Sequence, residues 1–410
     1  MDKVLERSVL CSGGCLHLGG SKSETARALV LQALLPSLVL ENASGSDDSV
    51  AMVKGLACKG QEVDIGYAGT AMRFLTAYFA CRQGREVLLT GSGRMKERPI
   101  DVLVSALRSL GADISYVERE GFPPLYIKGV AVRGGEVRME GGVSSQYASA
   151  LLLIAPFLPE GLKLTLEGRV TSRPYLEMTV SLLQEVFGKR IASWKGNCIE
   201  VFPREGELRG KGALRIESDW SSASYWYSFV ALSDVGTELC LKYFKGDSYQ
   251  GDRALVELYE LLGVHTVFEG DGIRLRRVSA PRLEVLDLDL NATPDIAQTV
   301  AVTCFGLGIG CELWGLHTLK IKETDRLLAL QTEMRKIGAK VEVSDDSLRL
   351  EAGAKLKSGV RIATYDDHRM AMAFAPLMLK VRLIIENSGV VSKSYPDFWE
   401  DVTKNVRLAE

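Results

Sequence analysis

The sequence predicts an α/β protein made of two globular domains that are built from one repeated unit. The chain has 410 residues, which exceeds the length of roughly 250–300 residues at which single cores stop growing. Hydrophobic residues make up 46% of the chain and charged residues 25%, a balance typical of chains that bury a core. An amphipathic helix, a glycine and two short alternating strands recur along the chain at a nearly constant interval.

Four copies of this pattern are visible, and each has a glycine between its helix and its strands. Gly111, Gly188, Gly263 and Gly338 are separated by 77, 75 and 75 residues. In the last copy the apolar residues of 327–337 recur at helical spacing, and the segments 340–343 and 348–350 alternate as in a β-hairpin. Helix-glycine-hairpin is a common unit, but the even spacing favours true repetition. The chain has room for about five or six such units in two globules.

Charge and composition exclude several classes of protein. With 50 Lys and Arg against 52 Asp and Glu, the net charge of -2 argues against nucleic acid as the main partner. No segment has the roughly 20 apolar residues that span a bilayer, and residues 1–7 do not resemble a signal peptide. The eight cysteines form no CxxC pair and the four histidines are scattered. We therefore expect a cytoplasmic protein with reduced thiols and no metal site.

The first candidate anion site is a glycine-rich turn that leads into a helix over 28–35. Ser21 and Glu24 have the spacing of a capping box, Lys22 adds positive charge, and Ser23 and Arg27 share a helix face. A phosphate or carboxylate fits such a helix start, although the segment is not a Walker loop. A well-capped surface helix would produce the same pattern.

Two further clusters place small or hydroxyl residues beside donors. Gly69 precedes an alanine-rich helix, where it allows a ligand to approach the backbone closely. If the segment before Pro99 is extended, Arg94, Lys96 and Arg98 project to one side, as many solvated residues do. Helix starts with hydroxyl or amide donors follow at Ser144, Ser145 and Gln146, and again at Ser172 and Tyr175. Helix capping explains these equally well.

The second half of the chain contributes carboxylates. Asp295 precedes a helix over 296–303, where it is either an early-turn stabiliser or a general base. Lys322 and Arg326 are expected on one helix face, with Glu323 three residues before Arg326, although such ion pairs are common and weak. Arg369 and Lys393 lie in two more donor-rich segments. Together the helix starts predict a cleft between two globules that binds a multiply anionic set of ligands.

In order along nearly the whole chain, these segments resemble the 5-enolpyruvylshikimate-3-phosphate synthase family. They are SKSETAR, AGTAMR, LTGSGRMKERPI, SSQYASALLL, SRPY, SDWSSASY, TPD, KIKETDR, DDHRMAM and KSYPDF. The resemblance implies two domains of about three βαβαββ units each, residues 19–215 and residues 1–18 with 216–410, and an active site in the cleft between them. It also implies a monomeric enzyme without a cofactor, which transfers the enolpyruvyl group of phosphoenolpyruvate to the 5-hydroxyl of shikimate 3-phosphate and releases phosphate.

The resemblance assigns the site residues. The shikimate 3-phosphate set is Lys22, Ser23, Arg27, Ser144, Ser145, Gln146, Ser172, Tyr175, Asp295 and Lys322. The phosphoenolpyruvate set is Lys22, Gly69, Arg98, Gln146, Arg326, Arg369 and Lys393. In the implied mechanism Glu323 protonates the methylene carbon and Asp295 takes the hydroxyl proton, while Lys22 and Lys393 offset charge.

Three residues depart from the family pattern, and two alternatives stay open. Tyr67 and Phe74 stand where Asn and Pro are usual, which is expected to alter the phosphoenolpyruvate wall and the response to glyphosate. Thr318 replaces an Asn and is expected to weaken a shikimate contact. One alternative is the related transferase that acts on UDP-N-acetylglucosamine, which uses a loop cysteine that the segment 91–98 lacks. The other is an anion-binding relic without turnover.

Overall fold

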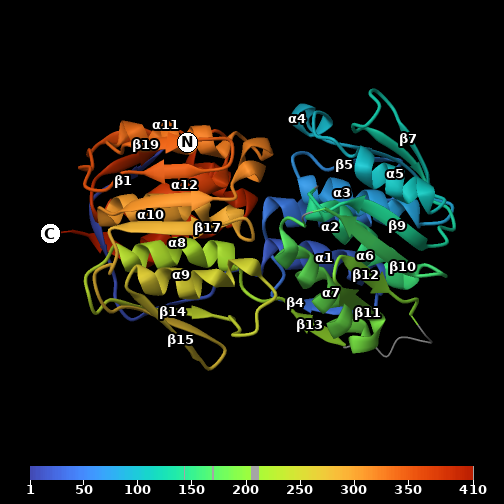
Figure 1. The fold of residues 1–410 in the computed structure, drawn as a ribbon, viewed down its shortest axis with the longest axis horizontal. Helices are drawn as coiled ribbons and strands as arrows, with labels where there is room; N and C mark the ends of the chain where they lie inside the picture. Colours follow the sequence, from blue (N-terminus) through green and yellow to red (C-terminus); the bar gives the residue numbers. More distant parts are fainter. Residues whose placement is uncertain (143, 169, 205–211, 410) are drawn as a thin grey trace. The chain divides into compact units, whose positions relative to one another are not determined.

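The computed structural model describes residues 1–142, 144–168, 170–204 and 212–409. The chain forms two compact units, and the second of them is inserted into the first. Unit 1 contains Met1–Gly19 and Glu217–Glu410, and unit 2 contains Gly20–Ile216. Helices and strands alternate through both units, which confirms the α/β class (Figure 1).

Unit 2 contains two four-stranded sheets and one pair of strands. The first sheet has the order β5 (Glu62–Asp64), β6 (Glu86–Thr90), β8 (Leu125–Lys128) and β7 (Asp113–Tyr116). The second has the order β9 (Gly135–Glu140), β10 (Leu162–Glu167), β12 (Cys198–Val201) and β11 (Ala192–Lys195). The parallel pair is β4 (Val39–Glu41) with β13 (Ala213–Arg215).

Unit 1 contains two more four-stranded sheets. One has the order β3 (Gly14–Leu16), β14 (Glu238–Lys242), β16 (Gly272–Arg277) and β15 (Val264–Glu269). The other has the order β17 (Val285–Asp289), β18 (Gly310–Trp314), β20 (Leu348–Leu350) and β19 (Val341–Val343). The chain ends complete the unit with β21 (Val360–Ile362), β22 (Leu383–Ile385), β1 (Lys3–Leu5), β2 (Ser8–Leu10) and β23 (Val406–Leu408).

The four four-stranded sheets share one connectivity. In each of them the first two strands along the sheet are parallel, and the next two are the arms of an antiparallel hairpin. Each hairpin follows a helix and a glycine, as the repeat predicts. After the last of these helices Gly338 has a φ of 104°, a left-handed conformation that glycine adopts at little cost.

Each unit has a core of apolar helices that lie side by side. In unit 1 they are α8 (Trp220–Ala231), α10 (Ala297–Leu307) and α12 (His368–Phe374), which contact one another (Figure 1). In unit 2 they are α1 (Lys22–Leu34), α3 (Gly69–Ala80) and α6 (Ser145–Ile154). Nearly every residue of α8, α10 and α12 is buried, because a helix that is apolar on all sides belongs inside a core.

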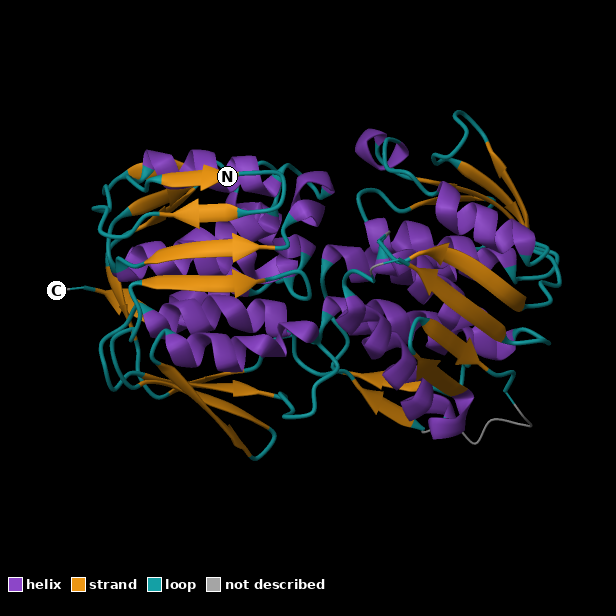
Figure 2. Cartoon of the chain, in the orientation of Figure 1, coloured by secondary structure: helices purple, strands orange, loops and turns teal. Residues whose placement is uncertain are grey.

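The remaining helices lie outside these cores, with strands toward the outside of each unit (Figure 2). In unit 2 they are α2 (Asp47–Ala57), α4 (Gly93–Lys96), α5 (Asp101–Ser109) and α7 (Arg173–Phe187). Of these, α5 and α7 are strongly amphipathic. In unit 1 they are α9 (Leu255–Leu261), α11 (Arg326–Lys336) and α13 (Phe398–Asn405). Among the described residues, no helix has both the length and the apolar character that crossing a membrane requires.

Candidate functional site

In unit 2 the predicted residue Arg27 is buried and joins three helices. Its Nε donates to Thr179 Oγ1 over 2.7 Å, and its Nη2 donates to Ser149 Oγ and to the Tyr175 carbonyl oxygen, both over 3.1 Å. Its Nη1 donates to the Ser23 carbonyl oxygen over 2.8 Å, which confirms that Ser23 and Arg27 share a helix face. Burial lowers the pKa of the guanidinium to about 10, so Arg27 remains charged at neutral pH.

The starts of α1 and α6 in unit 2 are capped by neutral serines. Ser21 Oγ accepts from the Glu24 amide over 3.4 Å, and Ser144 Oγ accepts from the Gln146 amide over 3.3 Å. Lys22 lies in the first turn of α1 and pairs with Asp48 over 3.0 Å, with both side chains about one-fifth exposed. At α6 no acidic residue lies in the first turn, so the positive end of the helix dipole is uncompensated and suits an anionic ligand, whereas Glu24 lies in the first turn of α1.

Gly69 and Arg98, 29 positions apart in the sequence, lie against each other. A Cβ atom on Gly69 would lie 2.5 Å from Nη1 of Arg98, so only glycine leaves the guanidinium in place. The side-chain amide of Gln146 donates from Nε2 to Thr70 Oγ1 over 2.9 Å, which links the start of α6 to the start of α3. Three predicted residues therefore gather at two neighbouring helix starts.

The extended segment that would place Arg94, Lys96 and Arg98 in one row does not form. The segment forms the short helix α4 rather than a strand, because Ser92 Oγ caps it by accepting from the Met95 amide. Arg94 pairs with Glu97 over 2.7 Å and Lys96 pairs with Glu118 over 2.6 Å, so these two side chains belong to surface ion pairs.

The start of α7 holds the last predicted residues of unit 2. Ser172 has a φ of 52°, a left-handed conformation that is costly for a residue with a Cβ. Tyr175, one turn into the helix, places its ring 5.9 Å from the Arg27 guanidinium carbon. Strain of this kind persists where surrounding contacts enforce it, as at many binding sites.

In unit 1 the predicted acidic residues share one buried arginine. Arg326 is 2% exposed, and its Nη1 donates to Asp295 Oδ1 over 3.0 Å while its Nη2 donates to Glu323 Oε2 over 2.8 Å. Its Nε donates to Asp367 Oδ2 over 2.6 Å. Burial alone would lower the pKa of Arg326, but these three carboxylates raise it above its ordinary value.

Asp295 is surrounded by cations. Besides Arg326, Lys322 Nζ lies 3.6 Å from Oδ1, and Arg369 Nη2 lies 3.2 Å from Oδ2. The side chain lies in the 3-10 turn η4 (Pro294–Ile296), which leads into α10, and is 14% exposed. Cations around a carboxylate favour its charged form, and this is the form that accepts a proton.

Lys322 and Arg326 do not share a helix face, contrary to expectation. Asp325 Oδ1 accepts from the Leu328 amide and caps α11, so this helix begins only at Arg326. Lys322 follows the 3-10 segment η5 (His317–Ile321) in an extended conformation. Both cations nevertheless contact the same oxygen of Asp295.

The start of α12 completes the cluster in unit 1. Asp367 Oδ1 accepts from the Arg369 amide over 2.8 Å, and Arg369 Nη1 donates to the Asp295 carbonyl oxygen over 3.0 Å. Lys393, at the end of the 3-10 segment η7 (Ser388–Lys393), donates to the Asp366 carbonyl oxygen over 2.6 Å. Asp295, Glu323, Arg326 and Arg369 are therefore brought together, and Lys393 adjoins the turn before α12.

Comparison with known proteins shows to which family the chain belongs. The profile of EPSP synthase (3-phosphoshikimate 1-carboxyvinyltransferase) matches residues 38–402. A 3-phosphoshikimate 1-carboxyvinyltransferase of Bacteroides fragilis is 45% identical over 394 residues, which cover 95% of this chain and 94% of that protein. The chain belongs to the EPSP synthase family. A relative of the same description from Klebsiella pneumoniae is 35% identical over 437 residues and covers 100% of both chains.

Solved structures agree with the fold of an EPSP synthase. One from Acinetobacter baumannii has a TM-score of 0.79 at 19% identity and covers 100% of both chains. The enolpyruvyl transferase NikO from Streptomyces tendae has a TM-score of 0.72 at 13% identity and covers 98% of both chains. At these identities the likeness establishes the fold alone.

Several residues that support the candidate site were not predicted. Asp367 is fully buried beneath Arg326, and Ser149 and Thr179 hold Arg27. Asp252 accepts from Ser221 Oγ over 2.5 Å, and its pKa is raised to about 6 by burial and by Asp295. Of these four residues, only Asp367 could be recognised from the sequence, because an Asp before a helix is a common N-cap.

The departures from the EPSP synthase pattern lie in different environments. Tyr67 is 69% exposed, whereas Phe74 is buried with its ring 5.5 Å from the Arg27 guanidinium carbon. Phe74 therefore borders the predicted shikimate 3-phosphate set. The Oγ1 atom of Thr318 is buried and has no hydrogen-bond partner among the described residues, so this departure leaves a polar atom unsatisfied.

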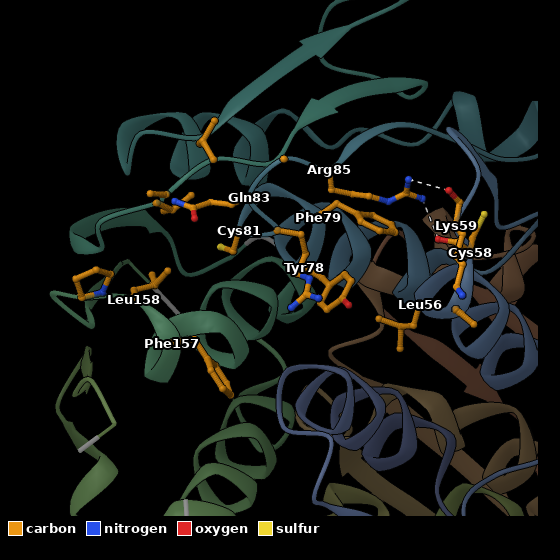
Figure 3. Close-up of a pocket in the computed structure, with 17 residues that line it drawn as sticks. Leu56, Cys58, Lys59, Tyr78, Phe79, Cys81, Gln83, Arg85, Phe157 and Leu158 are labelled. Atoms are coloured by element: carbon orange, nitrogen blue, oxygen red, sulfur yellow. Dashed lines mark hydrogen bonds between the residues drawn. The ribbon is translucent and has the colours of Figure 1, made fainter. Parts of the chain in front are cut away.

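Unit 2 also has a pocket of about 1080 Å³ that no predicted EPSP synthase residue lines (Figure 3). Tyr78, Phe79 and Phe157 supply aromatic walls, and Arg85 points toward the end of α2. Its guanidinium donates to the carbonyl oxygens of Cys58 and Lys59 over 2.9 and 3.0 Å, so it serves to hold that chain segment. In the part of the chain that the structure describes, no group of three or more His, Cys, Asp or Glu side chains could hold a metal ion.

Proposed function

We propose that this protein transfers the enolpyruvyl group of phosphoenolpyruvate to the 5-hydroxyl of shikimate 3-phosphate and releases phosphate. The proposal rests on one observation in unit 1: two carboxylates bind the same arginine, Arg326. Asp295 and Glu323 bind the two Nη atoms of Arg326 over 3.0 and 2.8 Å, so two carboxylates for two proton transfers are held by one fixed group. The family membership supports the identity of the substrates.

The shikimate 3-phosphate set is proposed to use the neutral helix starts of unit 2. Ser144, Ser145, Ser172 and Gln146 offer hydroxyl and amide donors to phosphate oxygens. Lys22 supplies charge, and Arg27 fixes Ser23 and Tyr175 through their carbonyl oxygens. The remaining members of this set are Lys322 and Asp295.

The phosphoenolpyruvate set is proposed to consist mainly of guanidinium and ammonium groups. Arg98, Arg326 and Arg369 suit a carboxylate and a phosphate because a guanidinium can bind either group with two parallel hydrogen bonds. Gly69 keeps the Arg98 guanidinium in place, since any Cβ would collide with it. The remaining members of the set are Lys22, Gln146 and Lys393.

In the proposed mechanism the two carboxylates have separate duties. Glu323 protonates the methylene carbon of phosphoenolpyruvate while Asp295 removes the proton of the 5-hydroxyl, and the oxygen attacks the carbon that bears the phosphate. Lys22 and Lys393 offset the negative charge of the tetrahedral intermediate. Reversal of the proton transfers then expels phosphate and restores the double bond.

The acceptor decides between this function and its alternatives. Phosphate release is measured with phosphoenolpyruvate plus shikimate 3-phosphate, and in parallel with phosphoenolpyruvate plus UDP-N-acetylglucosamine. The proposal expects release only with the first acceptor, and the absence of a cysteine from segment 91–98 supports this choice. Release only with the nucleotide sugar would establish the alternative transferase, and tight ligand binding without release would establish a relic.

We also infer a cytoplasmic monomer that does not bind nucleic acid. The near balance of 50 basic and 52 acidic residues supports the last point, because nucleic-acid binders carry an excess of basic residues. Sedimentation at micromolar concentration should give a single species of monomer mass. A dimer mass, or a shift on addition of duplex DNA, would contradict the inference.

A further inference from the structure

Two cysteines on neighbouring strands of unit 1 face each other. Cys15 on β3 is paired in register with Cys240 on β14, and the two sulfur atoms lie 2.8 Å apart. Leu239 and Leu241, which flank Cys240, are completely buried. Since side chains alternate along a strand, both cysteines lie on the outer face of the sheet, where Cys15 is exposed and Cys240 is half-buried.

The backbone already satisfies the geometry of a disulfide. Neighbouring strands lie about 4.8 Å apart, within the range of roughly 4.4–6.8 Å that separates the Cα atoms of bonded cysteines. Both residues are free thiols in the structure. A bond would bring the sulfurs closer by less than about 1 Å, since a disulfide is about 2.05 Å long. Bond formation therefore requires no rearrangement of the strands.

The surroundings give the two thiols different roles. Burial and the hydrogen bond with Cys15 raise the pKa of Cys240 to about 11, so this thiol keeps its proton at neutral pH. Arg274 is the residue opposite Cys240 on β16, and Lys242 lies two positions along the same strand face. These cations stabilise a thiolate at Cys240 once its proton is lost, whereas Cys15 is the thiol that solvent and reagents reach.

We propose that Cys15 and Cys240 form a redox site that exchanges with low-molecular-weight disulfides. The Cys15 thiolate attacks one sulfur of the incoming disulfide, forms a mixed disulfide and expels one thiolate. Cys240 then loses its proton, and its sulfur attacks Cys15 and expels the second thiolate. Two protein thiols are oxidised by two electrons, the reagent is reduced to two thiols, and these take up the two protons.

The test is exposure of the reduced protein to glutathione disulfide, followed by thiol counting and peptide mapping by mass spectrometry. The wild type should lose two thiols together and yield one linked peptide pair that joins residues 225 positions apart. Cys15 and Cys240 should retain no glutathione. Cys240→Ser should instead accumulate one glutathione on Cys15, because the resolving thiol is missing. Circular dichroism confirms that each variant is folded.

Cys58→Ser is the matched control, because Cys58 is also partly exposed but lies in unit 2 without a cysteine partner among the described residues. This variant should form the linked pair at the wild-type rate. A stable glutathione adduct on wild-type Cys15 would overturn the proposal, and so would linked-pair formation no faster than modification of Cys58. None of these outcomes depends on enolpyruvyl transfer, so the result is independent of the proposed function.

Discussion

Arg326 donates from Nε to the carboxylate of Asp367 over 2.6 Å, and both side chains are fully buried. The remaining nitrogens of the same guanidinium bind Asp295 and Glu323. Asp367 therefore fixes the plane of the arginine, and the arginine fixes the two carboxylates to which we assign the proton transfers. Asp367 is therefore a positioning residue, whereas Arg326 is itself proposed to bind phosphoenolpyruvate.

Asp367→Asn should destabilise unit 1 and lower activity. Asparagine replaces the buried carboxylate by a neutral acceptor, while Asp295 and Glu323 still compensate the charge of Arg326. Loss of the charged hydrogen bond is expected to cost about 1.5–3 kcal/mol. Chemical denaturation measures the loss, and Glu257→Gln is the control because Glu257 on α9, whose side chain is 64% exposed, forms an ion pair with Arg253 near the surface. Equal stability losses in the two variants would contradict the role given to Asp367.

Asp295→Asn and Glu323→Gln should each lower kcat far more than they raise either KM. Both substitutions keep the size of the side chain but remove its ability to exchange a proton, an effect worth about 10²–10⁴ in rate. Steady-state kinetics with a melting curve for each variant separates lost chemistry from lost folding. A Glu323→Gln variant that is folded and turns over at a near-normal rate would refute the assignment of the carbon acid.

Gly69→Ala should raise the KM for phosphoenolpyruvate and leave stability nearly unchanged. The new Cβ would lie 2.5 Å from Nη1 of Arg98, and the flexible arginine can move aside. We expect the KM for phosphoenolpyruvate to rise by about tenfold or more, which corresponds to about 1.4 kcal/mol of lost binding. An equal rise for shikimate 3-phosphate would contradict the assignment of Gly69 and Arg98 to phosphoenolpyruvate.

Arg27→Ala should raise the apparent KM for shikimate 3-phosphate, and the structure adds an expected loss of stability. The guanidinium makes four hydrogen bonds that join α1, α6 and α7, so its removal leaves buried acceptors unpaired. A loss of about 2–4 kcal/mol is expected from such groups. Arg27→Lys should recover only part of this stability, because lysine lacks the planar array of donors.

Asp252 predicts a pH dependence of stability. Burial and then Asp295 raise the pKa of its carboxyl from 3.8 to about 6, so the folded state binds a proton that the unfolded state has already lost. Stability should therefore fall as the pH rises from about 4 to about 7, by roughly 3 kcal/mol from this group. Asp252→Asn should remove this slope and be more stable than wild type at pH 8. If the free energy of unfolding changed with pH in the same way in both proteins, the raised pKa of Asp252 would be contradicted.

Much of the fold was accessible from sequence because it repeats. The glycines at 75-residue intervals, such as Gly263 and Gly338, mark the ends of helices before hairpins, and local periodicity is enough to recognise them. The helix starts were also accessible, since caps such as Ser21 and Ser144 are local signals. These signals depend on residues within one turn of each other.

What could not be predicted depends on contacts between distant segments. Asp367 lies 41 positions from Arg326, and Thr179 lies 152 positions from Arg27, so neither pair leaves a periodic signal. Ser92 caps the short helix Gly93–Lys96, so the extended conformation on which a row of Arg94, Lys96 and Arg98 depended does not form. Arg94 and Lys96 form surface ion pairs with Glu97 and Glu118, as residues in solvent commonly do.

The most direct test of the central claim is the stoichiometry of the reaction, followed by ³¹P NMR. Phosphoenolpyruvate and shikimate 3-phosphate are mixed with the protein in equal amounts. We predict that inorganic phosphate and one new phosphorylated product appear together, in equal amounts, and that neither forms when Asp295→Asn replaces the wild type. Phosphate release without the new product, or no release while both ligands bind, would contradict the account.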